Sequence, residues 1–159
     1  MLTRRGNLVV AGIALGVALA AVVLVVALGS RGSRPSGRTP AALGEWIYRT
    51  GTDSTGTPIR FSGGMMMRAA CATCHGTDGH GRATPMFTAP NITYANLTDP
   101  KGMLDPDGSR GPTYTDATLR RAVSQGIDPG GAHLAWPMPQ WRLTDREWLD
   151  LLSYLKTLH

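Results

Sequence analysis

Apolar residues are unevenly distributed along this chain, and the longest run of them lies near the N-terminus. Residues 8–28 read LVVAGIALGVALAAVVLVVAL, without a charged or polar side chain, and Arg4 and Arg5 come just before them. As a helix this run would be about 32 Å long, enough to cross the hydrocarbon core of a bilayer. The pattern predicts a transmembrane anchor over 8–28 behind a cytoplasmic segment 1–7. A cleaved signal peptide is the alternative.

The pattern changes twice in the next stretch of chain. Residues 29–40, GSRGSRPSGRTP, have no apolar periodicity and predict a flexible linker. The sequence AALGEWIYR follows and has apolar side chains at helical spacing. Thr39 suits the position that caps a helix and Pro40 suits its first turn, so a short helix is expected where the domain of residues 41–159 begins.

The middle of the chain is less regular. Residues 51–64 are rich in turn-forming residues and predict a loop or a brief hairpin. Residues 65–75 are compatible with a helix that stops at Gly76. Residues 79–112 contain much glycine, proline, aspartate and asparagine and show no sustained period. An irregular segment of this length in a compact domain is expected to wrap around a non-protein group.

Two helices are predicted in the C-terminal part. Thr115 can cap a helix over 116–125 that ends at Gly126, and Thr144 with Glu147 forms a capping box before a second helix. Helices therefore dominate and strands are scarce, so the predicted fold class is all-α. The apolar stripe of the last helix has the spacing i, i+3, i+4, i+7 and consists of Trp148, Leu151, Leu152 and Leu155.

The charge of the chain is concentrated at one end. The formal net charge is +5, from 16 lysines and arginines against 11 aspartates and glutamates. Five of the arginines lie within residues 1–38, which hold no acid, so the remaining 11 basic residues balance the 11 acidic ones. A formally neutral domain lacks the basic surface on which nucleic-acid binding depends, and no nucleic-acid partner is expected.

The only two cysteines lie in one short motif. Cys71-Ala72-Thr73-Cys74-His75 has the pattern C-x-x-C-H, which is typical of covalent attachment of a c-type haem. Thiols three residues apart on one helical turn can reach the two vinyl groups of a porphyrin, and the next residue offers an imidazole to the iron. A zinc site, a thioredoxin-like dithiol and a local disulfide are the competing interpretations. A single motif predicts a single haem c, bound by Cys71, Cys74 and His75.

The second axial position of the iron decides between electron transfer and ligand chemistry. Met138 is the preferred candidate because the sequence Trp-Pro-Met-Pro presents its thioether from a stiff loop before the last helix. Met86 is the second choice, and His133 is a further possible ligand. The other sulfur candidates are Met65, Met66, Met67 and Met103.

In this order, the motif at 71–75, the proline-flanked Met138 and the last helix resemble class I c-type cytochromes. The likeness covers about residues 41–159, and the sequences around 74–79, 90–93 and 126–139 are similar to cytochrome domains that accompany bacterial membrane dehydrogenases. The resemblance implies a fold in which the N- and C-terminal helices cross beside the haem, with His75 as proximal and Met138 as distal ligand. It also implies a proline carbonyl that supports the proximal imidazole, from either Pro85 or Pro90.

With both axial positions filled by protein, the expected function is electron transfer and not enzymatic catalysis. The chain would carry one electron at a time between a quinol-oxidising complex or dehydrogenase and a terminal acceptor such as an oxidase. The anchor would place it in the bacterial inner (cytoplasmic) membrane as a single-pass protein, with the haem domain facing the periplasm or the cell exterior. The alternatives are a haem enzyme or gas sensor with a labile sixth ligand, and a fixed subunit of an oxidase or dehydrogenase complex.

Overall fold

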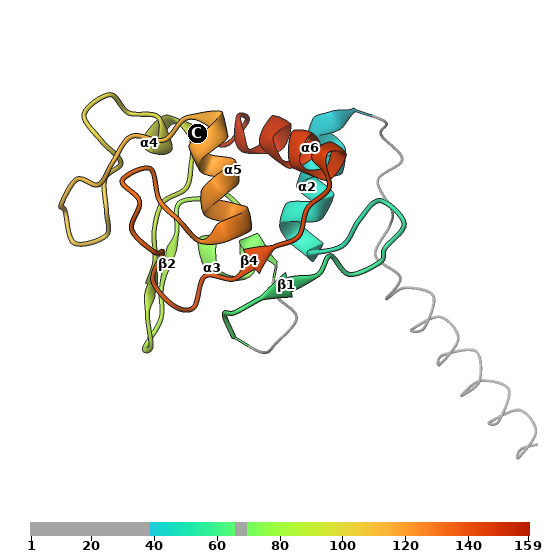
Figure 1. The fold of residues 1–159 in the computed structure, drawn as a ribbon, viewed down its shortest axis with the longest axis horizontal. Helices are drawn as coiled ribbons and strands as arrows, with labels where there is room; N and C mark the ends of the chain where they lie inside the picture. The colour runs from blue at the N-terminus through green and yellow to red at the C-terminus, as the bar shows by residue number, and fades with distance from the viewer. Residues whose placement is uncertain (1–38, 66–69) are drawn as a thin grey trace, which may run out of the picture. The chain divides into compact units, whose positions relative to one another are not determined.

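The computed structural model describes residues 39–65 and 70–159 (Figure 1). The predicted anchor at 8–28 and residues 1–7 lie outside this part of the chain. Among the described residues, no helix has both the length and the apolar character needed to cross a bilayer. The helices are α2 (Pro40–Thr50), α3 (Cys71–His75), α4 (Tyr94–Leu97), α5 (Asp116–Gln125) and α6 (Asp145–Leu155), and the two-residue strands are β1 (Phe61–Ser62), β2 (Arg82–Ala83), β3 (Thr88–Ala89) and β4 (Gln140–Trp141).

The three longer helices begin at the predicted capping residues. Thr39 accepts a hydrogen bond from the backbone N–H of Ala42 through its side chain, and Pro40 occupies the first turn of α2. Thr115 caps α5 and Thr144 caps α6, each in a reciprocal capping box. These side chains satisfy N–H groups that the first turn of a helix leaves without partners.

Helices α2 and α6 pack against each other and make the most extensive contact between elements of the described domain (Figure 1). The helices approach most closely at Gly44, where a Cβ atom would lie 1.9 Å from the carbonyl oxygen of Asp150 and 2.8 Å from the Cβ of Tyr154. One turn further along, the rings of Tyr48 and Tyr154 are 5.2 Å apart between centroids and tilted by 55°. The surrounding core is continuous and includes Trp141, Trp148, Leu151 and Leu155.

Short antiparallel ladders add to the helical framework and depart from the all-α expectation. Strand β1 pairs with β4, and β2 pairs with β3. The β2–β3 hairpin and α4 lie within the segment that lacks sequence periodicity, so that segment is irregular only in part. Residues 51–64 form turns as predicted and include a local antiparallel bridge between Thr52 and Pro58, while β1 pairs with a strand far along the chain.

The helix predicted over 65–75 is wrong at its start. Met65 and Ala70 are not helical, and α3 covers only residues 71–75. Ala70 has extended backbone angles, φ −132° and ψ 150°, and its side chain has no oxygen that could cap the helix. The predicted end at Gly76 is confirmed, because α3 stops at His75.

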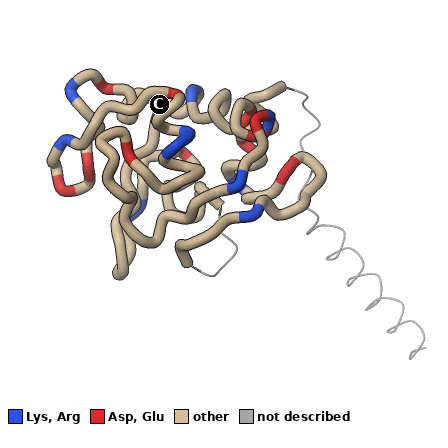
Figure 2. The backbone as a smooth tube through the Cα atoms, viewed as in Figure 1, with Lys and Arg blue, Asp and Glu red and all other residues tan. Residues whose placement is uncertain are grey.

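Charges of both signs are interspersed over the described domain (Figure 2). Many of the charged side chains form ion pairs, some within one helix and others between different parts of the chain. The pairs are Arg49–Glu45, Arg110–Asp99, Arg120–Asp145, Arg146–Asp150 and Lys156–Asp116.

Candidate haem-binding site

The two cysteines lie on the single turn of α3. Their separation of three residues places them on the same side of the helix. Neither is in a disulfide, and both are half-buried. Cys71 and Ala72 pack against the hydrophobic core, so the position of this turn is fixed by the body of the domain.

The environment of the thiols argues against a dithiol redox centre. Burial, with a smaller contribution from the nearby Cys74, raises the pKa of the Cys71 thiol to about 12. Burial also raises the pKa of Cys74, although the positive charge of Arg82 opposes the shift. Redox-active cysteines depend on a lowered pKa. Both thiols are protonated at neutral pH, which is unlike a thioredoxin-type motif.

His75 is buried, and the structure fixes which of its ring nitrogens is available to a metal. Its Nδ1 lies 2.9 Å from the carbonyl oxygen of Pro90. Because a carbonyl only accepts hydrogen bonds, Nδ1 carries the proton and Nε2 keeps its lone pair. Burial lowers the pKa of His75, while the bond to Pro90 partly opposes this. The imidazole is therefore neutral at neutral pH, the form that binds a metal, and Pro90 rather than Pro85 supports it.

The backbone after His75 turns sharply and is held by main-chain hydrogen bonds. Gly76 has φ 77° and ψ 164°, a conformation that favours glycine. The N–H of Gly81 donates to the carbonyl of His75 at 2.9 Å. A Cβ on Gly81 would lie 2.3 Å from the carbonyl oxygen of Ala89, so this glycine allows the loop to pass directly against the segment that carries Pro90.

Tyr48 of α2 holds the same turn from the core side. Its side chain is fully buried, and its hydroxyl donates to the carbonyl of Gly76 at 2.7 Å. Tyr154 of α6 makes a longer bond, 3.4 Å, to the carbonyl of Thr77. The sequence pattern alone does not single out Tyr48, although its position four residues after Gly44 places both on the helix face that meets α6.

These residues fit a covalently attached haem. Two thiols share one helical turn, and the next residue is a neutral imidazole whose other nitrogen is bound to a main-chain carbonyl. The zinc alternative has no such support, since the described residues contain no cluster of three or more histidine, cysteine or acidic side chains that could hold a metal ion.

Met138 lies in the loop that leads into β4. We call residues 135–139 the methionine loop. A 3.2 Å hydrogen bond from the N–H of Met138 to the carbonyl of Ala135 closes a turn in this loop. The side chain of Met138 is half-buried. Pro137 and Pro139 flank it, and the Trp136–Pro137 peptide bond is cis. Iron ligation by Met138 stays a prediction.

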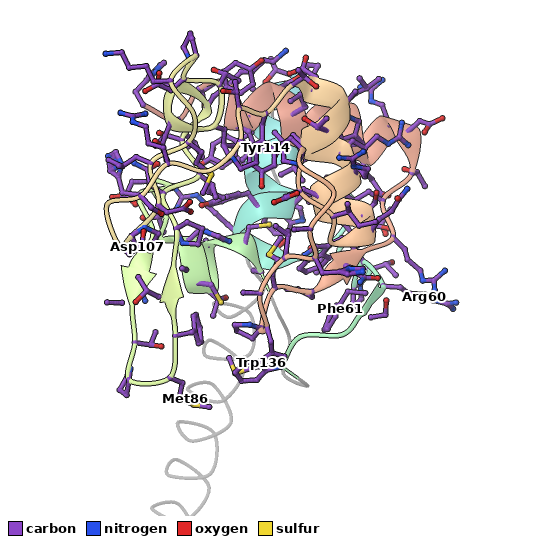
Figure 3. The ribbon with its side chains drawn as sticks, turned by 60° about the vertical axis from the view of Figure 1, so that its left-hand side comes forward. Arg60, Phe61, Met86, Asp107, Tyr114 and Trp136 are labelled. Carbon is purple, nitrogen blue, oxygen red and sulfur yellow. The ribbon has the colours of Figure 1, made fainter. Side chains whose placement is uncertain are left out.

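The competing axial candidates have other environments. Met86 is 71% exposed at the end of the β2–β3 hairpin (Figure 3), and Met103 is buried in the core cluster. His133 is exposed, as are His80 and His159. Met66 and Met67 lie outside the described residues.

The fold and the site together define a small, mostly helical domain built around a haem-attachment motif. The chain belongs to the cytochrome c family, because the family model described as Cytochrome c matches residues 63–159. It binds haem c covalently at the motif of Cys71, Cys74 and His75, and membership of the family implies electron transfer through haem. Searches of curated proteins and of solved structures give no match.

Proposed function

We propose that this protein is a membrane-anchored, single-haem class I cytochrome that carries one electron at a time. Its donors would be membrane respiratory or dehydrogenase complexes, and its acceptor a terminal oxidant on the periplasmic side. The observation that carries the proposal is the bond from Nδ1 of His75 to Pro90, because it orients a neutral imidazole beside two free thiols. When bound, haem supplies one-electron redox chemistry at its iron.

The protein residues divide the work of holding the cofactor. Cys71 and Cys74 would form the covalent links to the haem, and His75 and Met138 would bind its iron. Pro90 keeps the His75 ring in one tautomer and makes it a better electron donor. A thioether as the second ligand raises the reduction potential and leaves no position open to substrate, which favours electron transfer over catalysis.

Exposed apolar side chains near one edge of the domain would contact the partner proteins. Trp136 is 57% exposed and Met86 is 71% exposed, and both lie at the same edge in the view of Figure 3. Large apolar side chains exposed together are typical of interaction sites. We expect the Trp136→Ser variant to accept electrons more slowly from membranes of the source organism, while its reduction by dithionite is unchanged. Equal rates with membranes would contradict this contact.

The distal ligand is tested by the optical spectrum of the purified ferric protein beside that of its Met138→Ala variant. The wild-type protein should show a sulfur-to-iron band that the variant loses. If the band persists in the variant, Met138 is not the ligand, and a Met86→Ala variant tests the second choice. Rapid binding of carbon monoxide to the reduced wild-type protein would instead favour a haem enzyme or gas sensor.

The anchor is tested by comparing the full chain with a variant that lacks residues 8–28. The full chain should sediment with membranes and require detergent for release, because 21 apolar residues are long enough to span a bilayer. If expression of the full sequence instead gives a haem-containing protein in the soluble periplasmic fraction, shortened at its N-terminus, residues 8–28 belong to a cleaved signal peptide. Co-purification of stoichiometric partner subunits in detergent would identify a fixed subunit of a complex.

A further inference from the structure

We propose that residues 51–64, which we call the strap, hold the methionine loop in place, and that Gly64 is the positioning residue at the contact. The strap lies between α2 and the haem-attachment motif in sequence, yet it packs against a loop more than 70 residues further along. The inference rests on the proposed role of Met138 as the distal ligand. Beyond that role, the strap would determine how firmly Met138 is held.

The first half of the strap is fixed to α2. The N–H of Gly51, the first residue of the strap, donates to the carbonyl of Ile47 in α2, and Gly51 in turn accepts a hydrogen bond from the N–H of the buried Ile59. The indole Nε1 of Trp46 in α2 donates to the carbonyl of Asp53 at 3.0 Å. The Asp53 carboxylate in turn accepts hydrogen bonds from the backbone N–H groups of residues 55 and 57. The strap is therefore an ordered turn tied to the core.

The second half pairs with the strand that follows the methionine loop. Phe61 lies opposite Trp141 in the β1–β4 ladder, and their rings are 5.1 Å apart between centroids. The N–H of Arg142 donates to the carbonyl of Arg60 at 2.8 Å. Since Trp141 is only 4% exposed, this ladder connects the strap and the end of the methionine loop to the core.

Gly64 makes the closest approach to the methionine loop itself. A Cβ built on it would lie 2.7 Å from the carbonyl oxygen of Pro137 and 3.0 Å from the Cβ of Pro139, the two residues that flank Met138. Both neighbours are backbone or ring atoms of prolines, which have little freedom to move aside individually. A side chain at position 64 must therefore displace the loop together with Met138.

The chain contains a matched control for this contact in the preceding residue. Gly63 has φ +69° and Gly64 has φ +71°, so alanine has nearly the same unfavourable backbone conformation at both positions. Apart from its chain neighbours, a Cβ on Gly63 would meet no atom of the described residues within 4 Å. Any difference between the two alanine variants therefore reports the contact with the methionine loop and not the backbone conformation.

The experiment uses the full haem-bound chain with Gly63→Ala or Gly64→Ala. The readout is the rate at which imidazole replaces the sulfur ligand in the ferric protein, followed by loss of the sulfur-to-iron band. We expect Gly64→Ala to bind imidazole about tenfold faster than the wild type, which corresponds to about 1.4 kcal/mol. Gly63→Ala should bind it at the wild-type rate. Equal rates in the two variants would overturn the proposal.

Hydrogen exchange at the backbone of residues 138–142 separates this inference from the identity of the ligand. Gly64→Ala should speed exchange in this segment more than Gly63→Ala does, whichever residue binds the iron. If Met138→Ala kept the sulfur-to-iron band while exchange still differed in this way, the ligand assignment would fail and the strap contact would stand. Unchanged exchange in Gly64→Ala would show that the strap does not hold the loop.

Discussion

Removing the Tyr48 hydroxyl tests how the turn after His75 is held. The Tyr48→Phe variant keeps the buried ring and its contact with Tyr154, so the packing energy of the aromatic pair is unchanged. It loses the 2.7 Å hydrogen bond to the carbonyl of Gly76. Because Tyr48 is fully buried, that carbonyl is left without its tyrosine donor in the interior. An unsatisfied buried acceptor costs about 1–3 kcal/mol, and we expect a loss of this size in the free energy of unfolding.

Guanidinium denaturation of the haem-bound protein, followed by tryptophan fluorescence, measures this loss. The Tyr154→Phe variant is the control, because its hydroxyl lies 3.4 Å from the carbonyl of Thr77 and makes a weak bond at best. We expect the control to lose less than about 0.5 kcal/mol. If Tyr48→Phe is no less stable than Tyr154→Phe, the Gly76 carbonyl has another donor and the reasoning is wrong.

Three further predictions concern the helix crossing, a surface ion pair and the proximal loop. Gly44→Ala should lower the free energy of unfolding, measured by thermal unfolding, by about 3 kcal/mol, because its Cβ would lie 1.9 Å from a carbonyl oxygen of α6. This loss should occur although alanine favours helices over glycine by about 1 kcal/mol. Unchanged stability would contradict the close helix crossing. Asp116→Asn should cost less than about 1 kcal/mol, since Asp116 and Lys156 are both nearly half exposed. The bond to Lys156 lowers the pKa of Asp116 below 3.8. The stabilisation that the charged Asp116 gives the folded protein is therefore complete above pH 3.8 and is lost as the pH falls through the lower native pKa. The acid unfolding curve of the variant should lack this loss of stability. Gly81→Ala should weaken the bond between the His75 ring and Pro90, because its Cβ would lie 2.7 Å from the Pro90 carbonyl carbon; an unchanged reduction potential would contradict this.

Features that depend on neighbouring residues could be predicted from the sequence. The caps at Thr39, Thr115 and Thr144 are local, since each side chain bonds to a backbone N–H three residues later. The haem-attachment motif is equally local, because its thiols and imidazole lie within five consecutive residues. In such cases the covalent chain brings the interacting groups together, so the spacing in sequence already contains the geometry.

Features that depend on distant segments could not be predicted in the same way. The choice of Pro90 over Pro85 depends on where the loop after His75 meets the β2–β3 hairpin, and both prolines follow the motif at plausible distances. The pairing of β1 with β4 involves two residues on each side, too few to show an alternating pattern. The start of α3 was predicted too early because apolar residues before the motif suit a helix, whereas Ala70 is extended and cannot cap one.

The two sides of the site are therefore held by different parts of the chain. On the proximal side, the bonds of the His75 segment run to Tyr48, Gly81 and Pro90. On the side of Met138, the ties run to the strap and to the end of α5, where the N–H of Leu134 donates to the carbonyl of Gly126. Among the described residues, these two sets share no hydrogen-bonding residue. Under the proposed ligation by Met138, a substitution in the strap is therefore expected to change how firmly that ligand is held without moving the His75 imidazole. The proposal therefore predicts that sequence changes in residues 51–64 adjust the iron site while the attachment motif stays constant.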